Sequence, residues 1–504
     1  MKKIVSLMLV IVLALSMIGC GAKETGTADK VTDGVTEGPK KQAEEPDKEE
    51  LEHVTIKFTY PGSPQQDEEM VEKAINDYLK DKINASIDID PIEWSAYLEK
   101  TNLMMATGDE LDILFTASWY EYYNNVFKKA FIPLNDLIDQ YAPKTKELLH
   151  PALFEGPKVD GELYALPTNK EIASARGLFL RKDLVEKYNF DISQIKTMDD
   201  FETVLEPMLQ VIKENEPGIY PYYCNGMGLA QFDNLNDSVG STLGAYNPRT
   251  GKIVYGEEQP EYMAMLKLAY KWNNKGYINE DALTAQESVP NMFATYMNYK
   301  PGKDAEMSVQ LGVELIGIPI GAIKTTTEDV TGSMMAIART SKNPERCMMF
   351  LELLNTDRYL NNLLNFGIED VHYVKVKENV IDFPEGVTAQ TCTYYPSSQW
   401  MFQNQFLNYL RVGEAEDKWE QFDAFNNAAE QSQLLGFAFD SSNVKSEIAA
   451  CGIVGDEYSV ALIVGIMEPE EGVKKYLEKV KANGSEKIIT EKQRQVDEFL
   501  ANKK

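Results

Sequence analysis

Histidine is scarce in this sequence of 504 residues, and its scarcity limits the metal chemistry available to the chain. The three histidines stand far apart, at His53, His150 and His372. None of them belongs to an HExxH or HxH spacing, so a zinc or iron centre would have to be built from carboxylates or thiols instead. We therefore predict no metal site and no cofactor.

Cysteine is also rare, and its spacing excludes two further kinds of site. Five cysteines occur and no two of them form a CxxC pair, which excludes a zinc knuckle and a thioredoxin-type motif. Cys347 lies in the apolar stretch RCMMFLELL and is predicted to pack as a small core residue. The sequence does not decide whether one disulfide forms among the residues Cys224, Cys347, Cys392 and Cys451.

Basic residues are fewer than acidic residues in this sequence. Lysine and arginine number 50 against 79 aspartates and glutamates, which gives a formal net charge of −29, and no block of basic residues interrupts this pattern. Such a chain is repelled by nucleic acid, so we predict no nucleic-acid partner. A GxxxxGK[ST] loop is absent as well, so the chain carries no ATPase phosphate loop of this kind. The hydrophobic fraction of 43% is nevertheless enough for a folded core.

Only the N-terminus carries a long apolar run. Two lysines precede the run from Ile4 to Ile18, which is shorter than the roughly 20 residues that span a bilayer and fits a cleaved secretory signal. Residues 17–20, the sequence MIGC, resemble a bacterial lipobox, with Met17 where leucine is preferred. The resemblance implies cleavage before Cys20, lipid attachment to it, and a place on the extracellular face of the cell membrane. The alternative is an ordinary signal peptide with a chance cysteine.

A polar segment follows the apolar run. From Gly21 to Glu50 the chain is rich in Gly, Thr, Lys, Asp and Glu and has no aromatic residue, so it cannot bury enough surface to fold. We predict a signal peptide over residues 1–19 and a lipid-anchored flexible linker over residues 20–52. A tether of this length would hold the folded body a few nanometres from the membrane.

After the linker, residue patterns typical of strands and helices alternate. The order is strand, helix, strand, helix, strand, at Val54–Tyr60, Asp67–Ile83, residues 84–92, Ser95–Met105 and Leu111–Ala117. This order favours a parallel α/β sheet with ligand-facing loops at the carboxyl ends of its strands. A strand, turn and helix follow at Ala175–Tyr188. Further helices are predicted at Thr197–Asn215, Pro260–Ile278, Asn343–Gly367 (a pair), Trp419–Gly436 and in two final segments broken at Asn483-Gly484.

Five stretches, in this order, resemble a known family. They are DGELYALP, LFLRKDLVEKY, KTMDDFETVL, KGYINEDAL and SKNPERCMMFLELL. Together they are similar to the extracellular solute-binding proteins of bacterial ABC importers, most closely the carbohydrate-binding family 1 group. The stretches GIEDVHYVK and GFAFDSSNVKSEIAACGIV resemble a lipoprotein subfamily of Gram-positive bacteria with an added C-terminal domain of uncharacterised function.

The resemblance implies a two-lobe α/β fold of the periplasmic-binding-protein (Venus flytrap) type, with the ligand cleft between the lobes. Its crossovers should lie near residues 169–176 and 324–331. The implied division is 53–168 plus 330–395 for lobe I, 169–329 plus 396–435 for lobe II, and 436–504 for a C-terminal helical extension. Function would be capture of a sugar by hinge closure and delivery to ABC permease subunits, without catalysis and as a monomer.

Position in the chain selects candidate ligand-binding residues, because aromatic faces and planar polar groups suit sugar recognition. Trp94 and Trp119 lie in loops that follow predicted strands, and the resemblance implies ligand contacts at Trp119 and at Trp400 in the stretch YYPSSQWMFQNQ. Tyr60 and Ser63 flank the first turn, and Asn169, Lys170 and Arg176 surround the first crossover, where a charged donor could bind an acidic sugar. The resemblance adds the three residues Tyr296, Asn298 and Ser333. Trp272, in a helical apolar stripe, is predicted to be core instead.

Three other functions stay open from the sequence. The cargo could be a peptide or another small solute, since a fold does not fix a function. The chain could serve a sensor kinase as its receptor. A secreted glycoside hydrolase would need two paired carboxylates, and no pair stands out among the 79 acidic residues.

Overall fold

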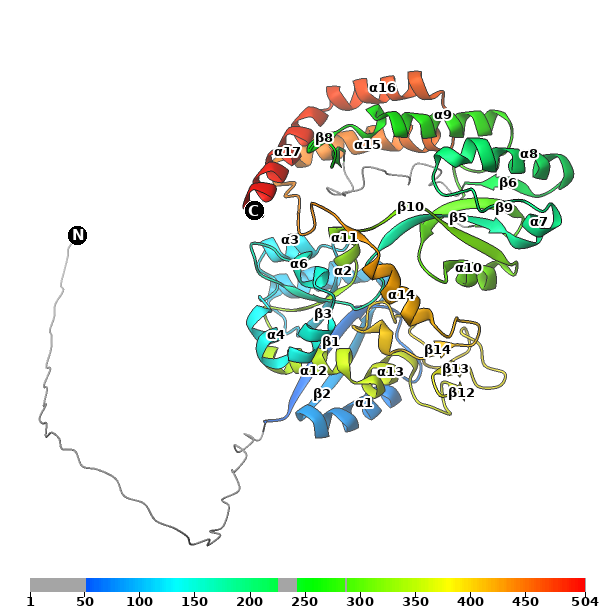
Figure 1. The fold of residues 1–504 in the computed structure, drawn as a ribbon. Coiled ribbons are helices and arrows are strands. Elements are labelled where there is room, and N and C mark those ends of the chain that lie inside the picture. The colour runs from blue at the N-terminus through cyan, green and yellow to red at the C-terminus, as the bar shows by residue number, and fades with distance from the viewer. Residues whose placement is uncertain (1–50, 225–242, 286–287, 504) are drawn as a thin grey trace, which may run out of the picture. The chain divides into compact units, whose positions relative to one another are not determined.

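The computed structural model describes residues 51–224, 243–285 and 288–503. The predicted signal peptide, Cys20 and the linker up to residue 50 lie outside this part of the chain. Residues Leu51–Lys504 form one compact unit, which contains two separate five-stranded sheets (Figure 1). Among the described residues, no helix combines the length and the apolar character needed to cross a bilayer.

The first sheet grows from the N-terminal α/β segment. Its order is β2-β1-β3-β11-β4, with the strands at Val54–Pro61 (β1), Ala85–Ile92 (β2), Ile113–Thr116 (β3), Ala165–Pro167 (β4) and Met334–Ile337 (β11). β1 runs parallel to β2 and β3, as the sequence predicts. β11 is antiparallel to both β3 and β4, so the sheet as a whole is mixed, although its N-terminal strands are parallel. The reason is that β11 enters this sheet after the chain has passed through the second one.

Helices cover the first sheet with regularly spaced apolar residues. Helix α1 (Glu68–Ile83) buries Val71, Ile75, Leu79 and Ile83, which recur every four residues on one face. The other helices of this region are α2 (Trp94–Thr107), α3 (Tyr122–Phe127), α4 (Asn135–Tyr141), α5 (Pro143–Leu148), α6 (Ala152–Glu155), α12 (Pro344–Thr356) and α13 (Arg358–Phe366). Cys347 on α12 is fully buried in this core, which confirms its predicted role.

The second sheet has the order β15-β10-β5-β9-β6. Its strands are β5 (Ser174–Arg181), β6 (Tyr220–Tyr223), β9 (Met292–Tyr299), β10 (Leu315–Thr325) and β15 (Glu430–Gln431). β5 is antiparallel to β10 and β9 on its two sides. The helices that lie between these strands in the sequence are α7 (Lys182–Lys187), α8 (Glu206–Asn215), α9 (Pro260–Asn274) and α10 (Lys303–Leu311).

Short strands form two smaller sheets outside these layers. One has the order β12-β13-β14 and the other pairs β7 with β8. Their bounds are β7 at Ala245–Asn247, β8 at Lys252–Val254, β12 at Val374–Lys377, β13 at Val380–Asp382 and β14 at Leu410–Arg411.

The chain crosses between the two large sheets where the resemblance predicts. Residues 168–173 join β4 to β5, and residues 326–333 join β10 to β11. The second crossing contains α11 (Thr327–Val330), which starts at a capping box in which Thr326 and Asp329 exchange hydrogen bonds. Helix α14 (Lys418–Asn427) braces the first crossing, because the Asn426 side chain accepts from the Ile172 N–H and donates to the Lys170 carbonyl.

The packing corrects the predicted lobe boundaries for the segment after residue 395. The prediction places residues 396–435 with the second lobe, but Met401 and Phe402 are buried in the core of the first sheet. The Phe402 ring contacts Phe58 and Tyr60. These apolar side chains bury against the core that lies next to them, and the chain rejoins the second sheet only at β15. The other predicted boundaries stay a prediction.

The C-terminal extension has no separate core. Helices α15 (Lys445–Ile463), α16 (Pro469–Ala482) and α17 (Ser485–Asn502) share one hydrophobic core with the second sheet and α9. Figure 1 shows α15, α16 and α9 running side by side. The sequence signals an added domain, but α16 and α17 are amphipathic and bury their apolar residues in this shared core.

Two predicted helices have different ends in the structure. The helix predicted at Trp419–Gly436 ends at Asn427, and the chain then turns into β15. The helix predicted from Thr197 begins at Phe201 with a π-turn. The Asp200 carboxylate accepts hydrogen bonds from the N–H groups of Lys196 and Thr197, so Asp200 and not Thr197 holds the turn before the helix. The four cysteines after Cys20 are all free thiols.

Candidate functional site

Three tryptophans from distant parts of the sequence lie together beside the first sheet. Trp94 begins α2 directly after β2, Trp119 follows β3, and Trp400 lies in the segment that packs onto the first core. The ring centroid of Trp94 is 6.2 Å from that of Trp119 and 6.2 Å from that of Trp400, and the last two are 6.4 Å apart. We call this group the tryptophan surface.

Neighbouring side chains hold these rings in place while leaving them accessible. The buried Phe115 ring of β3 contacts all three tryptophans. The Trp119 Nε1–H donates to the Gly332 carbonyl at 2.9 Å, and the Tyr120 hydroxyl donates to the Trp94 carbonyl at 3.2 Å. Trp94 and Trp119 remain 43% and 50% exposed. Aromatic faces that are both oriented and exposed are suited to binding a ligand rather than to core packing.

A cavity of about 540 Å³ opens beside Trp119. Trp119 and Gly332 reach it from the first sheet's region, and residues 170–176 and 326–329 reach it from the two crossings. The second sheet lines the rest through β5, the end of β9 and β10. The cavity therefore lies between the two sheets, at the crossings, which is where the two-lobe resemblance places the ligand cleft.

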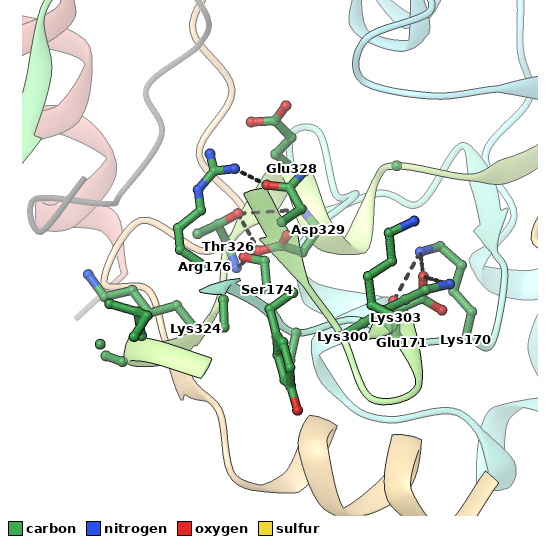
Figure 2. Close-up of a pocket in the computed structure, with 18 of the residues that line it drawn as sticks. Lys170, Glu171, Ser174, Arg176, Lys300, Lys303, Lys324, Thr326, Glu328 and Asp329 are labelled. Carbon is green, nitrogen blue, oxygen red and sulfur yellow. Dashed lines mark hydrogen bonds and ion pairs between the residues drawn. The ribbon is translucent and has the colours of Figure 1, made fainter. Parts of the chain in front are cut away.

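Charged side chains dominate the cavity wall on the side of the second sheet (Figure 2). Five are cationic, and we call them the cationic wall: Lys170, Arg176, Lys300, Lys303 and Lys324. Three are acidic: Glu171, Glu328 and Asp329. In the whole chain acidic residues outnumber basic ones by 79 to 50, so the charge balance of the cavity is the reverse of the chain's.

Glu171 organises two of the lysines. Its Oε1 lies 3.5 Å from the Lys170 Nζ and 3.8 Å from the Lys300 Nζ. Burial alone would raise the pKa of the Glu171 carboxyl, but the two ammonium groups outweigh it and the pKa is lowered. Burial would likewise lower the pKa of Lys300, yet Glu171 and Glu306 raise it. Both partners are therefore ionised at neutral pH.

Four predicted site residues lie at the first crossing or in the cavity. Lys170, Arg176 and Asn298 line the cavity, and an Arg176 guanidinium nitrogen donates to the Asn298 side-chain oxygen. Asn169 does not line it. Its side chain donates to Asn404 at 3.1 Å and its N–H to the Gln403 carbonyl, so it ties the crossing to the segment before β14.

Three predicted ligand contacts are buried, which contradicts the expectation that they face the cleft. Tyr60 is 1% exposed and packs against Phe402. Tyr296 is 2% exposed in the second core. The Ser333 hydroxyl lies 2.9 Å from the Thr168 hydroxyl and joins the two crossings. Tyr60 lies near the end of β1, Tyr296 within β9 and Ser333 directly before β11, and in each case the side chain points into the protein rather than into the cavity.

Ser63 lies in the exposed turn after β1, where its hydroxyl donates to Glu93 at 3.1 Å. It is neither on the tryptophan surface nor on the cavity wall. Trp272 is fully buried, as predicted, and its Nε1–H donates to Glu206.

Sequence reasoning missed the lysines of the second sheet. Lys300 follows β9, Lys303 begins α10, and Lys324 lies near the end of β10. Only the fold brings them to one wall, because β9 and β10 do not pair with each other but both pair with β5, which lies much earlier in the sequence. A positive signal existed in the local KPGK pattern of residues 300–303, but lysines at a turn are common. In the described part of the chain, no group of three or more His, Cys, Asp or Glu side chains could hold a metal ion.

The chain matches two family models. Residues 61–359 match the bacterial extracellular solute-binding protein family, and residues 433–501 match a domain of unknown function, DUF3502. The second match coincides with the extension that shares the core of the second sheet.

Similar proteins come from Streptococcus pneumoniae. A carbohydrate ABC transporter substrate-binding protein is 28% identical over 98% of this chain and 97% of its own length. The crystal structure of NgtS, an N-glycan transport solute-binding protein, is 27% identical, covers 90% of this chain and all of that one, and has a TM-score of 0.80. The structure of NgtS with Man1GlcNAc has a TM-score of 0.70.

These matches confirm the resemblance stated from the sequence, including its two lobes and its C-terminal domain. The first family model covers more than half of the chain, and the structural similarity extends over both sheets and the extension. This chain belongs to the bacterial extracellular solute-binding protein family.

Proposed function

We propose that this protein captures an oligosaccharide outside the cell and delivers it to the permease of an ABC importer. The observation that carries the proposal is the tryptophan surface at the edge of the cavity. Sugar rings present an apolar C–H face and an equatorial rim of hydroxyls, so they need a flat aromatic partner and nearby polar groups. Both are present here, the first in the tryptophans and the second in the cavity wall.

The number of tryptophans favours an oligosaccharide over a single sugar. Three rings with centroids 6.2 to 6.4 Å apart offer a wider apolar face than one sugar ring can cover. Uncovered aromatic surface would stay in water and contribute nothing to binding. The named ligands of NgtS are glycans, which agrees with this choice.

Hinge closure is the mechanism that we propose for capture. The crossings at residues 168–173 and 326–333 join the two sheets next to the cavity, so a small backbone change there would move one wall toward the other. This chain matches one structure of NgtS with a TM-score of 0.80 and the structure of NgtS with Man1GlcNAc with a TM-score of 0.70, a difference that a relative movement of the two lobes would produce. Closure stabilised by the ligand would produce the form that the permease recognises.

The membrane anchor is part of the same proposal. A lipid on Cys20 and a flexible linker would keep the binding unit close to the permease, and two or three acyl chains suffice for stable anchoring. We also propose that the protein acts as a monomer and performs no catalysis. Mass spectrometry of the mature N-terminal peptide tests the anchor, which requires an acylated Cys20.

A ligand screen tests the proposed function. The purified chain is heated with neutral glycans, including Man1GlcNAc and fructo-oligosaccharides, and separately with peptides and amino acids. A glycan bound at a Kd of ~1 μM and present at ~100-fold excess should stabilise the fold by about 2.7 kcal/mol. Stabilisation by peptides alone would favour the alternative cargo. Release of shorter sugars from the glycans would favour a hydrolase.

A further inference from the structure

The start of the C-terminal extension reaches the cores of both lobes. Residues 432–437, which we call the bridging segment, follow β15 at the edge of the second sheet. Leu435 is 6% exposed and belongs to the core of the first sheet. Its neighbours Leu434 and Phe437 belong instead to a small core with Val496 of α17. The bridging segment therefore links the two lobes in addition to the two crossings.

Hydrogen bonds join the bridging segment to the second crossing. The Ser432 N–H donates to the Thr325 carbonyl at 2.9 Å, at the end of β10. The Thr327 hydroxyl donates to the Leu434 carbonyl and accepts from the Gly436 N–H, each at 3.0 Å. Thr327 is the first residue of α11, within the crossing. A backbone change at this crossing, which hinge closure requires, therefore acts on the bridging segment as well.

At Gly436 the bridging segment meets a helix of the first lobe. Gly436 has a φ of 91°, and a Cβ at this position would lie 3.0 Å from the Glu155 carbonyl oxygen of α6 and 3.7 Å from the Phe499 ring of α17. Ala152 and Leu153 place α6 in the first core. Only a glycine fits where the chain passes so close to α6 with this backbone conformation.

The C-terminal end of α17 holds the bridging segment in place. The Phe499 ring packs edge-on against the Phe437 ring, with centroids 5.6 Å apart. The Lys503 ammonium group donates to the Gln433 carbonyl at 3.2 Å and to the Leu435 carbonyl at 3.0 Å. Helix α17 in turn shares the core of the second sheet. The end of the extension therefore fixes the bridging segment relative to the second lobe.

We propose that the C-terminal extension regulates the hinge. Through the bridging segment it stabilises the open arrangement of the lobes, in which the tryptophan surface is exposed. Rotation of the lobes about the crossings would move Leu435 and the Glu155 carbonyl relative to α17, so the contacts described above would have to rearrange. A ligand must then supply the free energy that these contacts lose on closure. The inference rests on the proposed function and assigns a regulatory role to a region that matches a domain of unknown function.

Two variants on α17, outside the cavity lining, test this inference. Lys503→Ala removes both hydrogen bonds to the bridging segment, and Phe499→Ala removes the ring contact with Phe437. Each should bind Man1GlcNAc, or the glycan that the ligand screen identifies, about threefold or more tightly than the wild type, because closure then costs less free energy. Lys487→Ala removes an ion pair with Glu447 inside the extension. It is the matched control and should bind as the wild type does.

Small-angle X-ray scattering without any glycan gives a second readout that does not depend on the cargo. Residues 51–504 form one compact unit, and this chain is used so that the linker does not contribute to the scattering. We expect a smaller radius of gyration for Lys503→Ala and Phe499→Ala than for the wild type, and no change for Lys487→Ala. Thermal melts identify a variant that loses its fold. Lys503 is exposed, so Lys503→Ala decides the test if Phe499→Ala unfolds.

Two outcomes separate this inference from the proposed function. If the folded α17 variants keep the affinity and the radius of gyration of the wild type, or bind glycan more weakly, this inference fails and the proposed function stands. If no glycan binds to any of the proteins, the proposed function fails, and the scattering alone decides whether the extension holds the lobes open.

Discussion

The tryptophans of this protein divide between two regions with opposite physical roles. Trp272 lies in the second core with no exposed surface, and its ring contacts Phe201 and Tyr222. Trp94 and Trp119 are about half exposed above the first sheet. The same residue type stabilises the folded core in one region and forms an exposed surface suited to ligand binding in the other. A satisfied Nε1–H does not separate the two roles, since Trp119 also donates a hydrogen bond. The exposed fraction of the ring does separate them.

The largest expected effect is in the buried region. Trp272→Ala removes a large core side chain and deprives Glu206 of a donor at 3.0 Å, so we expect a loss of about 3–5 kcal/mol in the free energy of unfolding. Chemical denaturation of the wild type and the variant measures it. A loss below about 1 kcal/mol would contradict the core role of Trp272.

The exposed region should behave in the opposite way. Trp119→Ala and Trp400→Ala should each weaken glycan binding about 10- to 100-fold, or about 1.4–2.8 kcal/mol. Their melting temperatures should stay close to that of the wild type. Calorimetric titration and thermal melts measure the two quantities. Tyr359→Ala on α13, an aromatic residue that is 56% exposed, is the control and should leave binding intact. If both tryptophan variants unfold, these residues are packing residues and the site is misplaced.

Cations can be compared in the same way, because Lys492 is buried while the cationic wall faces a cavity. Burial lowers the pKa of Lys492 from 10.5 to about 7. The unfolded chain therefore holds one more proton than the folded chain between these pH values, and stability rises with pH there. Lys492→Met should remove this rise, which amounts to about 1–2 kcal/mol between pH 7 and 8.5.

Denaturation of both proteins at pH 7 and pH 8.5 measures this difference. Lys474→Met, at an exposed position of α16, is the control and should keep the pH dependence of the wild type. Parallel pH profiles for the wild type and Lys492→Met would show that Lys492 stays charged in the fold.

The smallest expected effect concerns two buried tyrosines of the first core. The Tyr97 hydroxyl donates to the Phe115 carbonyl at 2.9 Å, whereas the Tyr60 hydroxyl is buried without a hydrogen-bond partner among the described residues. Tyr97→Phe should cost about 1 kcal/mol, and Tyr60→Phe should be neutral or slightly stabilising. Equal losses in the two variants would mean that the Tyr60 hydroxyl has a partner, such as an ordered water.

The sequence predicts the first half of the fold well because its signals are local. The alternation of Val54–Tyr60 and the four-residue spacing in α1 each depend on near neighbours. Helix α15 has no such signal, since its apolar residues are not confined to one face and its sequence contains Gly452 and Gly455, which are weak helix formers. The loop positions of Trp94 and Trp119 and the family resemblance at Trp400 made these residues candidates, and the structure brings all three together.

The cationic wall could not be predicted because it depends on pairing between distant strands. Lys300 and Lys324 meet at one cavity only because β9 and β10 both flank β5. The buried side chains of Tyr60 and Tyr296 failed as site predictions for a related reason. The position of Tyr60 near the end of a strand is visible in the sequence, but the direction in which a side chain points depends on which face the other elements cover.

The most direct test of the central claim is a crystal structure of this protein with an oligosaccharide selected by the binding screen. We predict that the glycan lies in the cavity between the two sheets, with its sugar rings stacked on Trp94, Trp119 and Trp400. A glycan bound elsewhere, or bound in the cavity without contact to these three rings, would contradict it.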